Sequence, residues 1–355
     1  HDTAGWRRRR PDGCLTAVRA AGPPATAMTM KTVSVPLELR SEYGIERIAA
    51  AFGVFDGVHL GHRRLLDRVV QMARDRHATP TAITFDTHPR AIVSTDLPPP
   101  LVSTIPQRLR LLESAGIEAA VLLPFGPAMA AMGPEEFLQT YVFAAGGPSV
   151  LAVCIGSAWR FGRGGSGDVG TLVREAARYG CQVESVAEAC LGGRPVSSTR
   201  IREEVQAGHL EAAAALLGRP FSVSGIVTPG KGIAKPLLAC PTANLQDADL
   251  VLPPSGVYAA LARRIARGST VPGIVYVGNA PTFAPEGSPP PPRIVELHLF
   301  EVAESLYGEE IEVEFVSLIR PDRRFASPDE LRAQIRRDIA VARERLGLPP
   351  AAHPA

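Results

Sequence analysis

Two histidines that flank a glycine give the sequence its clearest chemical signal. The segment Gly53–His62 reads GVFDGVHLGH, follows a short apolar run and opens a helical pattern, so His59 and His62 are expected where a strand passes into a helix. Open α/β sheets bind ligands at that edge, where free N–H groups favour an anion and Gly61 lets a phosphate approach the backbone. The pair therefore fits phosphoryl-type transfer by charge stabilisation. A turn cap or a metal site is the alternative, although no further metal ligands cluster nearby.

A second candidate lies 135 residues further on, where three hydroxyl residues precede a helical pattern. Ser197, Ser198 and Thr199 come first, and Arg202 follows Ser198 by one helical turn. Hydroxyls and free N–H groups at a helix start, with an arginine on the same face, can hold a polyphosphate. Alone, such a run is most often a helix cap. Together with the histidine pair in one domain, it predicts a triphosphate site.

Short apolar runs alternate with helical patterns around these motifs. That alternation predicts a parallel sheet with helices on both faces, and hence an α/β fold. The expected strands are Ile48–Phe52, Thr81–Phe85, Ala119–Leu123, Leu151–Ile155 and Gln182–Val186. The expected helices are Arg63–Arg74, Pro106–Ser114, Pro134–Phe143, Asp168–Arg178, Thr199–Ala207 and Leu210–Leu217.

The pattern changes near Gly218, where we place a domain boundary. Apolar runs separated by turn residues, without helices between them, predict a small antiparallel barrel or sandwich followed by one amphipathic helix, Pro328–Leu346. These runs are Phe221–Val227, Gly256–Arg263, Val271–Val277, Ile294–Val302 and Ile311–Val316. The proline-rich segment Glu286–Pro292 predicts an exposed loop. We expect a disordered leader over residues 1–30, domains over 31–218 and 219–347, and a tail over 348–355.

Composition and charge exclude several classes of protein. The 355 residues are 45% apolar and 21% charged, as in a globular protein with chain enough for two domains, and no apolar run could span a membrane. Residues 1–29 hold five arginines and two aspartates, which leaves 33 basic against 34 acidic residues elsewhere. A nucleic-acid binder carries its basic surplus on the folded part, so we expect neither nucleic acid nor membrane as partner. Five cysteines without a C-x-x-C pair predict a cytoplasmic location.

Two glycine-rich segments resemble nucleotide-binding motifs only superficially. Gly162–Gly167 matches G-x-G-x-x-G, but four expected strands precede it and Ser157–Phe161 separate it from the nearest one. Gly225–Gly232 nearly matches a P-loop, but Gly232 replaces the hydroxyl residue that holds Mg²⁺, and Pro236 follows too soon for a helix. Neither segment predicts a nucleotide site of its class.

The two chemical motifs together resemble the nucleotidylyltransferase superfamily. The first half is similar in sequence to bifunctional bacterial riboflavin kinase/FMN adenylyltransferases, or FAD synthetases. The segments that carry this similarity are FDGVHLGH, TFDTHPR, RFGRGGSGD and SSTRIREEVQAGHLEAAAALLGRPFSVSG. The second half contains CPTAN, GVYAAL, GNAPTF, VELHLFE and LYGEEIEVEFVSLIRPDRRFASPDELRAQI, which resemble the riboflavin kinase domain. The resemblance covers about residues 33–345. It implies a Rossmann-like nucleotidylyltransferase domain with a parallel sheet, followed by an antiparallel β-barrel kinase domain with a C-terminal helix.

The resemblance also assigns roles in the first domain, where AMP passes from ATP to FMN. His59 and His62 would stabilise the α-phosphate, and Ser198, Thr199 and Arg202 would hold the β- and γ-phosphates. Further nucleotide contacts fall on Phe55, Gly57, Gly61 and Ser197. Flavin contacts fall on His88 and Asp168.

For the second domain, the resemblance implies that ATP phosphorylates riboflavin to FMN. The resemblance implies that Thr242 and Asn244 coordinate Mg²⁺ and phosphate, and that Glu296 acts as general base on the ribityl hydroxyl. A phosphoryl transfer to an alcohol does need such a carboxylate and a hard cation held by oxygen ligands. Gly230 and Gly232 are expected to contact nucleotide, and Arg320 to contact flavin. Oligomerisation is possible, but the sequence does not predict it.

Both expected sites depart from the family pattern. Ala234 and Ala239 stand in a loop that is usually richer in glycine, and Ala158 stands where Asn or Asp is usual before F-x-F-G. An added Cβ could obstruct the approach of phosphates to the backbone. Two alternatives therefore stay open: a divergent paralogue with one active half or a modified flavin or nucleotide substrate, and a flavin-binding regulator without turnover.

Overall fold

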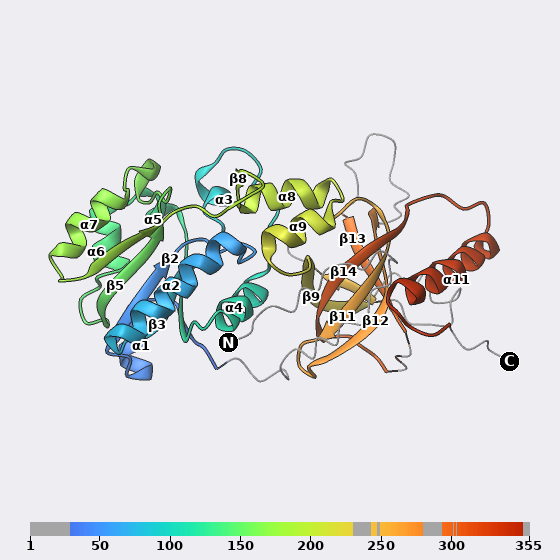
Figure 1. The fold of residues 1–355 in the computed structure, drawn as a ribbon, viewed down its shortest axis with the longest axis horizontal. Coiled ribbons are helices and arrows are strands. Elements are labelled where there is room, and N and C mark those ends of the chain that lie inside the picture. Colours follow the sequence, from blue (N-terminus) through green and yellow to red (C-terminus); the bar gives the residue numbers. More distant parts are fainter. Residues whose placement is uncertain are drawn as a thin grey trace. The chain divides into compact units, whose positions relative to one another are not determined.

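The computed structural model describes residues 29–229, 243–246, 249–279, 293–300, 302 and 304–350. These residues divide into two compact units (Figure 1). One consists of Ala27–Val223 with the later segment Asp247–Leu252, and the other of Ser224–Gln246 with Pro253–Ala355. Each unit is described by itself below.

The N-terminal unit is built on a sheet of six parallel strands in the order β1-β4-β3-β2-β5-β6. Alternate residues of the central strand pack on opposite faces: Ile48, Ala50 and Phe52 on one, Ala49 and Ala51 on the other. Burial on both faces explains why the inner strands of the sheet read as nearly continuous apolar runs. The strands are β1 Lys31–Val33, β2 Arg47–Phe52, β3 Thr79–Phe85, β4 Ala119–Leu123, β5 Ser149–Gly156 and β6 Gln182–Val186.

Helices cover both faces of this sheet, so the predicted α/β fold is confirmed. Helix α2 (Leu60–Arg76) and α4 (Ile105–Ser114) pack on one face, whereas α6 (Pro134–Tyr141) and α7 (Val169–Ala177) pack on the other. The remaining elements of the unit are α1 Pro36–Tyr43, α3 Arg90–Val93, α5 Pro127–Ala131, the 3-10 turn Arg163–Gly165, the hairpin β7 Cys190–Leu191 and β8 Arg194–Pro195, α8 Ser198–Gln206 and α9 Leu210–Leu217.

Strand β2 is the point at which the order of the strands reverses. It pairs with β3 on one side and with β5 on the other, and the chain leaves its carboxyl end through the turn that carries the histidine motif. Ligands bind at this kind of position in open α/β sheets. The turn holds Phe55 (φ 52°), Gly57 (φ 79°) and Val58 (φ 38°) in the left-handed region. A β-branched residue is rarely found there, so the turn is strained beside the expected site.

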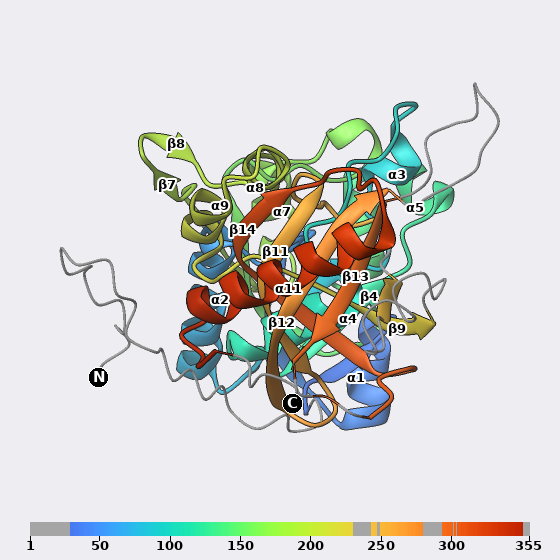
Figure 2. The ribbon, with the colours of Figure 1, turned by 90° about the vertical axis from the view of Figure 1, so that its right-hand side faces the viewer.

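The C-terminal unit is a closed antiparallel barrel in the order β10-β13-β12-β11-β14-β9, as the sequence predicts. On β13, Val295 and Leu297 are buried inside the barrel, and Glu296 therefore points to its outer face. Helix α11 (Pro328–Arg345) lies across strands of the outer face (Figure 2) and packs there through Ala342, Ile335 and Ile339. The strands are β9 Ser222–Pro229, β10 Ala243–Gln246, β11 Gly256–Arg264, β12 Ser269–Asn279, β13 Arg293–Leu299 and β14 Glu310–Pro321.

One short segment does not follow the order of the sequence. Residues 249–252 come after β10, yet they belong to the N-terminal unit, where the backbone N–H of Leu101 donates to Asp249 O (2.9 Å) and that of Val251 to Leu101 O (2.8 Å). The expected leader up to residue 28, the loop Glu286–Pro292 and the last five residues of the expected tail lie outside the described residues. Among the helices of the described ranges, none is long and apolar enough to cross a membrane.

Candidate active sites

The two motif histidines lie face to face at the start of α2. Their rings stack with centroids 3.7 Å apart and planes at 14°. His59 is the N-cap of the helix, and its Nδ1 accepts a hydrogen bond from the backbone N–H of His62 (3.3 Å). Because Nδ1 accepts, a neutral His59 carries its proton on Nε2. The geometry therefore fixes the tautomer of His59 and leaves an N–H donor at Nε2.

Burial keeps both imidazoles neutral. Desolvation lowers the pKa of His59 to about 4; the carboxylate of Asp56 opposes this shift, and the guanidinium of Arg219 adds to it. Burial also lowers the pKa of His62 well below its usual value, with smaller effects from His59 and from the guanidinium of Arg108. The pair is thus a set of neutral hydrogen-bond donors at neutral pH, which can bind a phosphate oxygen without a change in protonation.

Glycines and an aromatic ring pack closely around the histidine pair. A Cβ on Gly61 would lie 3.1 Å from Cε1 of His59, so the absence of a side chain there lets the imidazole fold back over the helix start. The ring of Phe55 is buried and meets His62 edge to face, with ring centroids 5.3 Å apart. A Cβ on Gly57 would lie 2.6 Å from Cγ1 of Val102. Gly57 and Phe55 therefore shape the turn, and Gly61 leaves space for the His59 ring.

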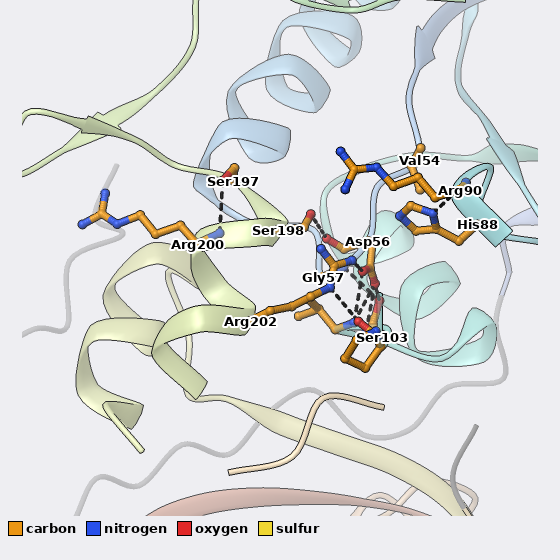
Figure 3. Close-up of polar contacts among 12 residues, drawn as sticks. Val54, Asp56, Gly57, His88, Arg90, Ser103, Ser197, Ser198, Arg200 and Arg202 are labelled. Carbon is orange, nitrogen blue, oxygen red and sulfur yellow. Dashed lines mark hydrogen bonds and ion pairs between the residues drawn. The ribbon is translucent and has the colours of Figure 1, made fainter. Parts of the chain in front are cut away.

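The hydroxyl-rich helix start meets the histidine turn, as the combined motifs predict. The hydroxyl of Ser198 donates to the backbone carbonyl of Asp56 (2.9 Å), and Ser197 caps α8 by accepting from Arg200 N (3.2 Å) (Figure 3). Thr199 is exposed at the first turn of α8. The N-terminal end of α8 therefore lies beside the turn that precedes His59, where its free N–H groups favour an anion.

Asp56 connects three segments in this site, although the sequence motifs predict no role for it. Its buried carboxylate accepts hydrogen bonds from the backbone N–H groups of Val102 and Ser103, each at 3.0 Å, and pairs with Nη2 of Arg202 at 2.6 Å. Nε of Arg202 donates to Pro100 O (2.6 Å), and the arginine side chain is 9% exposed. Figure 3 shows Asp56 between Arg202 and His88. The guanidinium of Arg202 is thus engaged with protein groups.

Two further arginines lie close to the histidines and were also not selected from the sequence. Arg219 donates to the carbonyls of Gly57 (2.7 Å) and Val58 (3.2 Å), and so supports the strained turn. Arg108 of α4 is 1% exposed and donates to Phe85 O at the end of β3 (2.9 Å). Arg219 directly follows the cap of α9 in the segment LLGRPF, and this position could have marked it as a candidate site residue. Arg108 lies within an amphipathic helix, and such a position does not distinguish a site residue from a surface arginine.

The two residues expected to bind flavin in this unit have different surroundings. His88 is half-buried and follows β3. Burial lowers its pKa; the negative charge of Asp56 opposes this shift, and the positive charge of Arg202 adds to it. His88 therefore lies within electrostatic range of Asp56 and Arg202. Asp168 is the N-cap of α7, and its Oδ1 accepts from Thr171 N (2.9 Å). That hydrogen bond lowers the pKa of Asp168. The contacts of Asp168 are those of a helix cap.

The expected kinase residues share one ring around the outside of the barrel. In the strand register, Asn244 of β10 lies opposite Glu296 of β13, which lies opposite Tyr276 of β12. Paired residues of neighbouring strands point to the same face. The ring continues through Val257 to Arg320 of β14. Glu296, Asn244 and Arg320 are therefore brought to one face of the barrel.

The members of this ring differ in what they already bind. Asn244 has a buried Oδ1 without a hydrogen-bond partner among the described residues. The phenol of Tyr276 donates to Asp322 (3.2 Å), and burial raises its pKa to about 12. Arg320 pairs with the buried Asp338 of α11 (2.9 Å), so it fastens the helix to the barrel. Gly230, Gly232 and Thr242, as well as Ala234 and Ala239, lie outside the described residues.

Comparison with known proteins identifies a family for each half of the chain. A family model described as FAD synthetase matches residues 43–200, and one described as riboflavin kinase matches residues 217–346. The bifunctional riboflavin kinase/FMN adenylyltransferase of Escherichia coli (strain K12) is 34% identical over 303 residues, which cover 85% of this chain and 94% of that protein. The protein of the same name from Bacillus subtilis (strain 168) is 31% identical over 315 residues, 87% of this chain and 96% of that protein.

A solved structure shares the fold. The crystal structure described as a macrolide-efflux protein from Streptococcus pneumoniae is 24% identical, with a TM-score of 0.71, and the match covers 88% of this chain and 97% of that one. The FAD synthetase model covers most of the parallel sheet, and the riboflavin kinase model covers the strands of the barrel. The chain therefore belongs to the family of the bifunctional riboflavin kinase/FMN adenylyltransferases, which use ATP.

Proposed function

We propose that the α/β unit transfers AMP from ATP to FMN with release of pyrophosphate, and that the barrel phosphorylates riboflavin with ATP to give FMN. The observation that carries the first half is the hydrogen bond from Ser198 to Asp56 O, because it joins the hydroxyl-rich helix start to the histidine turn. We assign residues 31–218 to the first activity and 219–347 to the second. Gly218, the left-handed cap of α9, supports this boundary.

In the adenylyl transfer, a phosphate oxygen of FMN attacks the α-phosphorus of ATP, and the bond to the β-phosphate oxygen breaks. We assign to His59 Nε2–H and to His62 the stabilisation of charge on the α-phosphate oxygens. The start of α8, with Ser197, Ser198 and Thr199, accommodates the β- and γ-phosphates. No proton needs to move, which agrees with two imidazoles that burial keeps neutral. We also assign to His88 a contact with FMN.

In the kinase, the ribityl hydroxyl of riboflavin attacks the γ-phosphorus of ATP, and ADP leaves. Glu296 would take the hydroxyl proton. The residues present fit Mg²⁺: Asn244 offers a buried oxygen without a partner, beside the carboxylate of Glu296, and oxygen ligands are those that Mg²⁺ prefers. Asn244 and Thr242 would hold the ion, which neutralises charge on the transferred phosphoryl group.

We also propose that Asp168 and Arg320 contact the flavin. Their contacts in the structure are a helix cap for Asp168 and an ion pair for Arg320. We also propose a cytoplasmic location. Its support is that Cys154, Cys181 and Cys190, the cysteines of the described ranges, form no disulfide.

The test is incubation with riboflavin, ATP and Mg²⁺, followed by chromatographic separation of FMN and FAD. We expect both products to form, FMN before FAD. FMN alone would indicate a chain with one active half, and bound but unconverted riboflavin would indicate a binding protein. Either of these results would contradict the proposal.

A further inference from the structure

Arg108 combines deep burial with very few partners. Its side chain is 1% exposed, which makes it the largest fully buried side chain of the described residues. It makes one hydrogen bond, from Nη1 to Phe85 O at 2.9 Å, and its buried Nε has no partner in the described part of the chain. Within the same ranges no carboxylate forms an ion pair with it. A guanidinium can donate five hydrogen bonds, so most of its capacity is unused.

An unpaired charge in such a place is costly to bury. Proteins normally pair or neutralise buried charges, and an arginine does not neutralise itself by losing its proton. The negative charge of Asp56 acts on Arg108, but the carboxylate of Asp56 already pairs with Arg202 and with the backbone of Val102 and Ser103. The two arginines thus share one carboxylate, and one positive charge remains without a counter-ion.

The position of Arg108 points to an anion that comes from outside the protein. Its partner Phe85 ends β3, next to β2 and at the same edge of the sheet as the histidine turn. The guanidinium also contributes to the lowered pKa values of His62 and of His88, so it lies within electrostatic range of both. A fixed positive charge at the edge where a phosphate reacts is what phosphoryl transfer uses.

We propose that Arg108 is a substrate-binding residue of the adenylyl-transfer site and binds a phosphate group there. This inference rests on the proposed function of the N-terminal unit. Two substrates carry phosphate, FMN and ATP, and the chemistry of a guanidinium suits both. A phosphate bound there supplies the missing counter-charge.

The test compares Arg108→Met, Arg108→Lys and the matched control Arg110→Met, which lies two residues further along α4 and is half-buried. The rate of FAD formation is measured with FMN and ATP varied in turn, and the rate of FMN formation by the barrel serves as an internal control. We expect Arg108→Met to lower kcat/KM by about 10- to 100-fold, the usual effect of losing a hydrogen bond to a charged group. Arg108→Lys should restore part of it. If only the KM for FMN rises, the contact is with the phosphate of FMN. If the KM for ATP rises, together with the KM for pyrophosphate in the reverse reaction, the contact is with ATP.

Unfolding separates this role from a structural one. Arg108→Met removes an unpaired buried charge, so its thermal midpoint without ligand should equal or exceed that of the wild type. FMN or ATP should stabilise the wild type and Arg110→Met more than Arg108→Met, a readout that does not depend on turnover. Failure of the wild type to form FAD would reject the proposed function, while this difference in stabilisation would still test the binding role. A lower midpoint with unchanged KM, kcat and stabilisation by ligand would overturn the inference.

Discussion

Replacing Asp56 by Asn should separate the contacts of this carboxylate. An asparagine can keep its oxygen toward the N–H groups of Val102 and Ser103, but its NH₂ then faces Nη2 of Arg202, which is also a donor. The variant therefore preserves the loop contact and breaks the ion pair. The helix start that holds Ser198 should shift with Arg202, because both lie on α8.

The burial of this pair sets the expected magnitude. Asp56 is 1% and Arg202 9% exposed, so salt and solvent screen the pair weakly. Breaking a buried pair by removing one partner costs about 3–5 kcal/mol. We expect the lower end, about 3 kcal/mol, because Nε of Arg202 keeps its bond to Pro100 O. For a unit of this size, that corresponds to a fall in Tm of about 6–12 °C.

The assay is a double-mutant cycle of Asp56→Asn, Arg202→Met and the double variant. Calorimetry gives the midpoint of the N-terminal unit, and the KM for ATP is measured in FAD formation. If the residues act as a pair, the double variant loses less stability than the sum of the two single variants, by about 1 kcal/mol or more. Additive losses, with an unchanged KM for ATP, would refute the reasoning. Riboflavin phosphorylation should stay at the wild-type rate throughout.

Three further variants test single features. The pKa of His59 is about 4 in the folded protein and about 6.5 in the unfolded chain, so the unfolded chain binds more protons between these pH values. The free energy of unfolding should therefore fall by about 3 kcal/mol from pH 6.5 to pH 4. Denaturant titrations of His59→Asn should show a smaller fall. Gly61→Ala should displace the His59 ring and lower FAD formation by about tenfold, with normal FMN formation; equal rates would contradict the observed packing. Arg320→Met should destabilise the barrel by about 3 kcal/mol through its buried partner Asp338, whereas an unchanged midpoint with a higher KM for riboflavin would assign Arg320 to the flavin instead.

Local sequence patterns predicted the strands and helices of the sheet because apolar periodicity reflects burial. Strand β4 and strand β6 have the predicted bounds, and the two phosphate motifs meet because both lie at the carboxyl edge of the same sheet. The short elements were missed. Strands β1 and β10 have three and four residues, too few for a period to be recognised.

Features that depend on tertiary contacts could not be predicted. Asp56 lies inside the histidine motif, but its role follows from a loop 46 residues away and a helix 146 residues away. Arg108 stands in an amphipathic helix, where an arginine normally faces solvent. Residues 249–252 belong to the N-terminal unit through backbone hydrogen bonds to Leu101. Backbone hydrogen bonds do not depend on the pattern of side chains, so the sequence does not predict them.

The central claim is that two separate sites perform two different transfers from ATP. It is tested most directly with ATP labelled at either the α- or the γ-phosphate, supplied with riboflavin to the wild type, to His59→Asn/His62→Asn and to Glu296→Gln. The histidine variant should carry γ-label into FMN and no α-label into FAD, while Glu296→Gln should transfer α-label to added FMN and no γ-label to riboflavin. Loss of both transfers in either variant, with both units folded, would contradict the account.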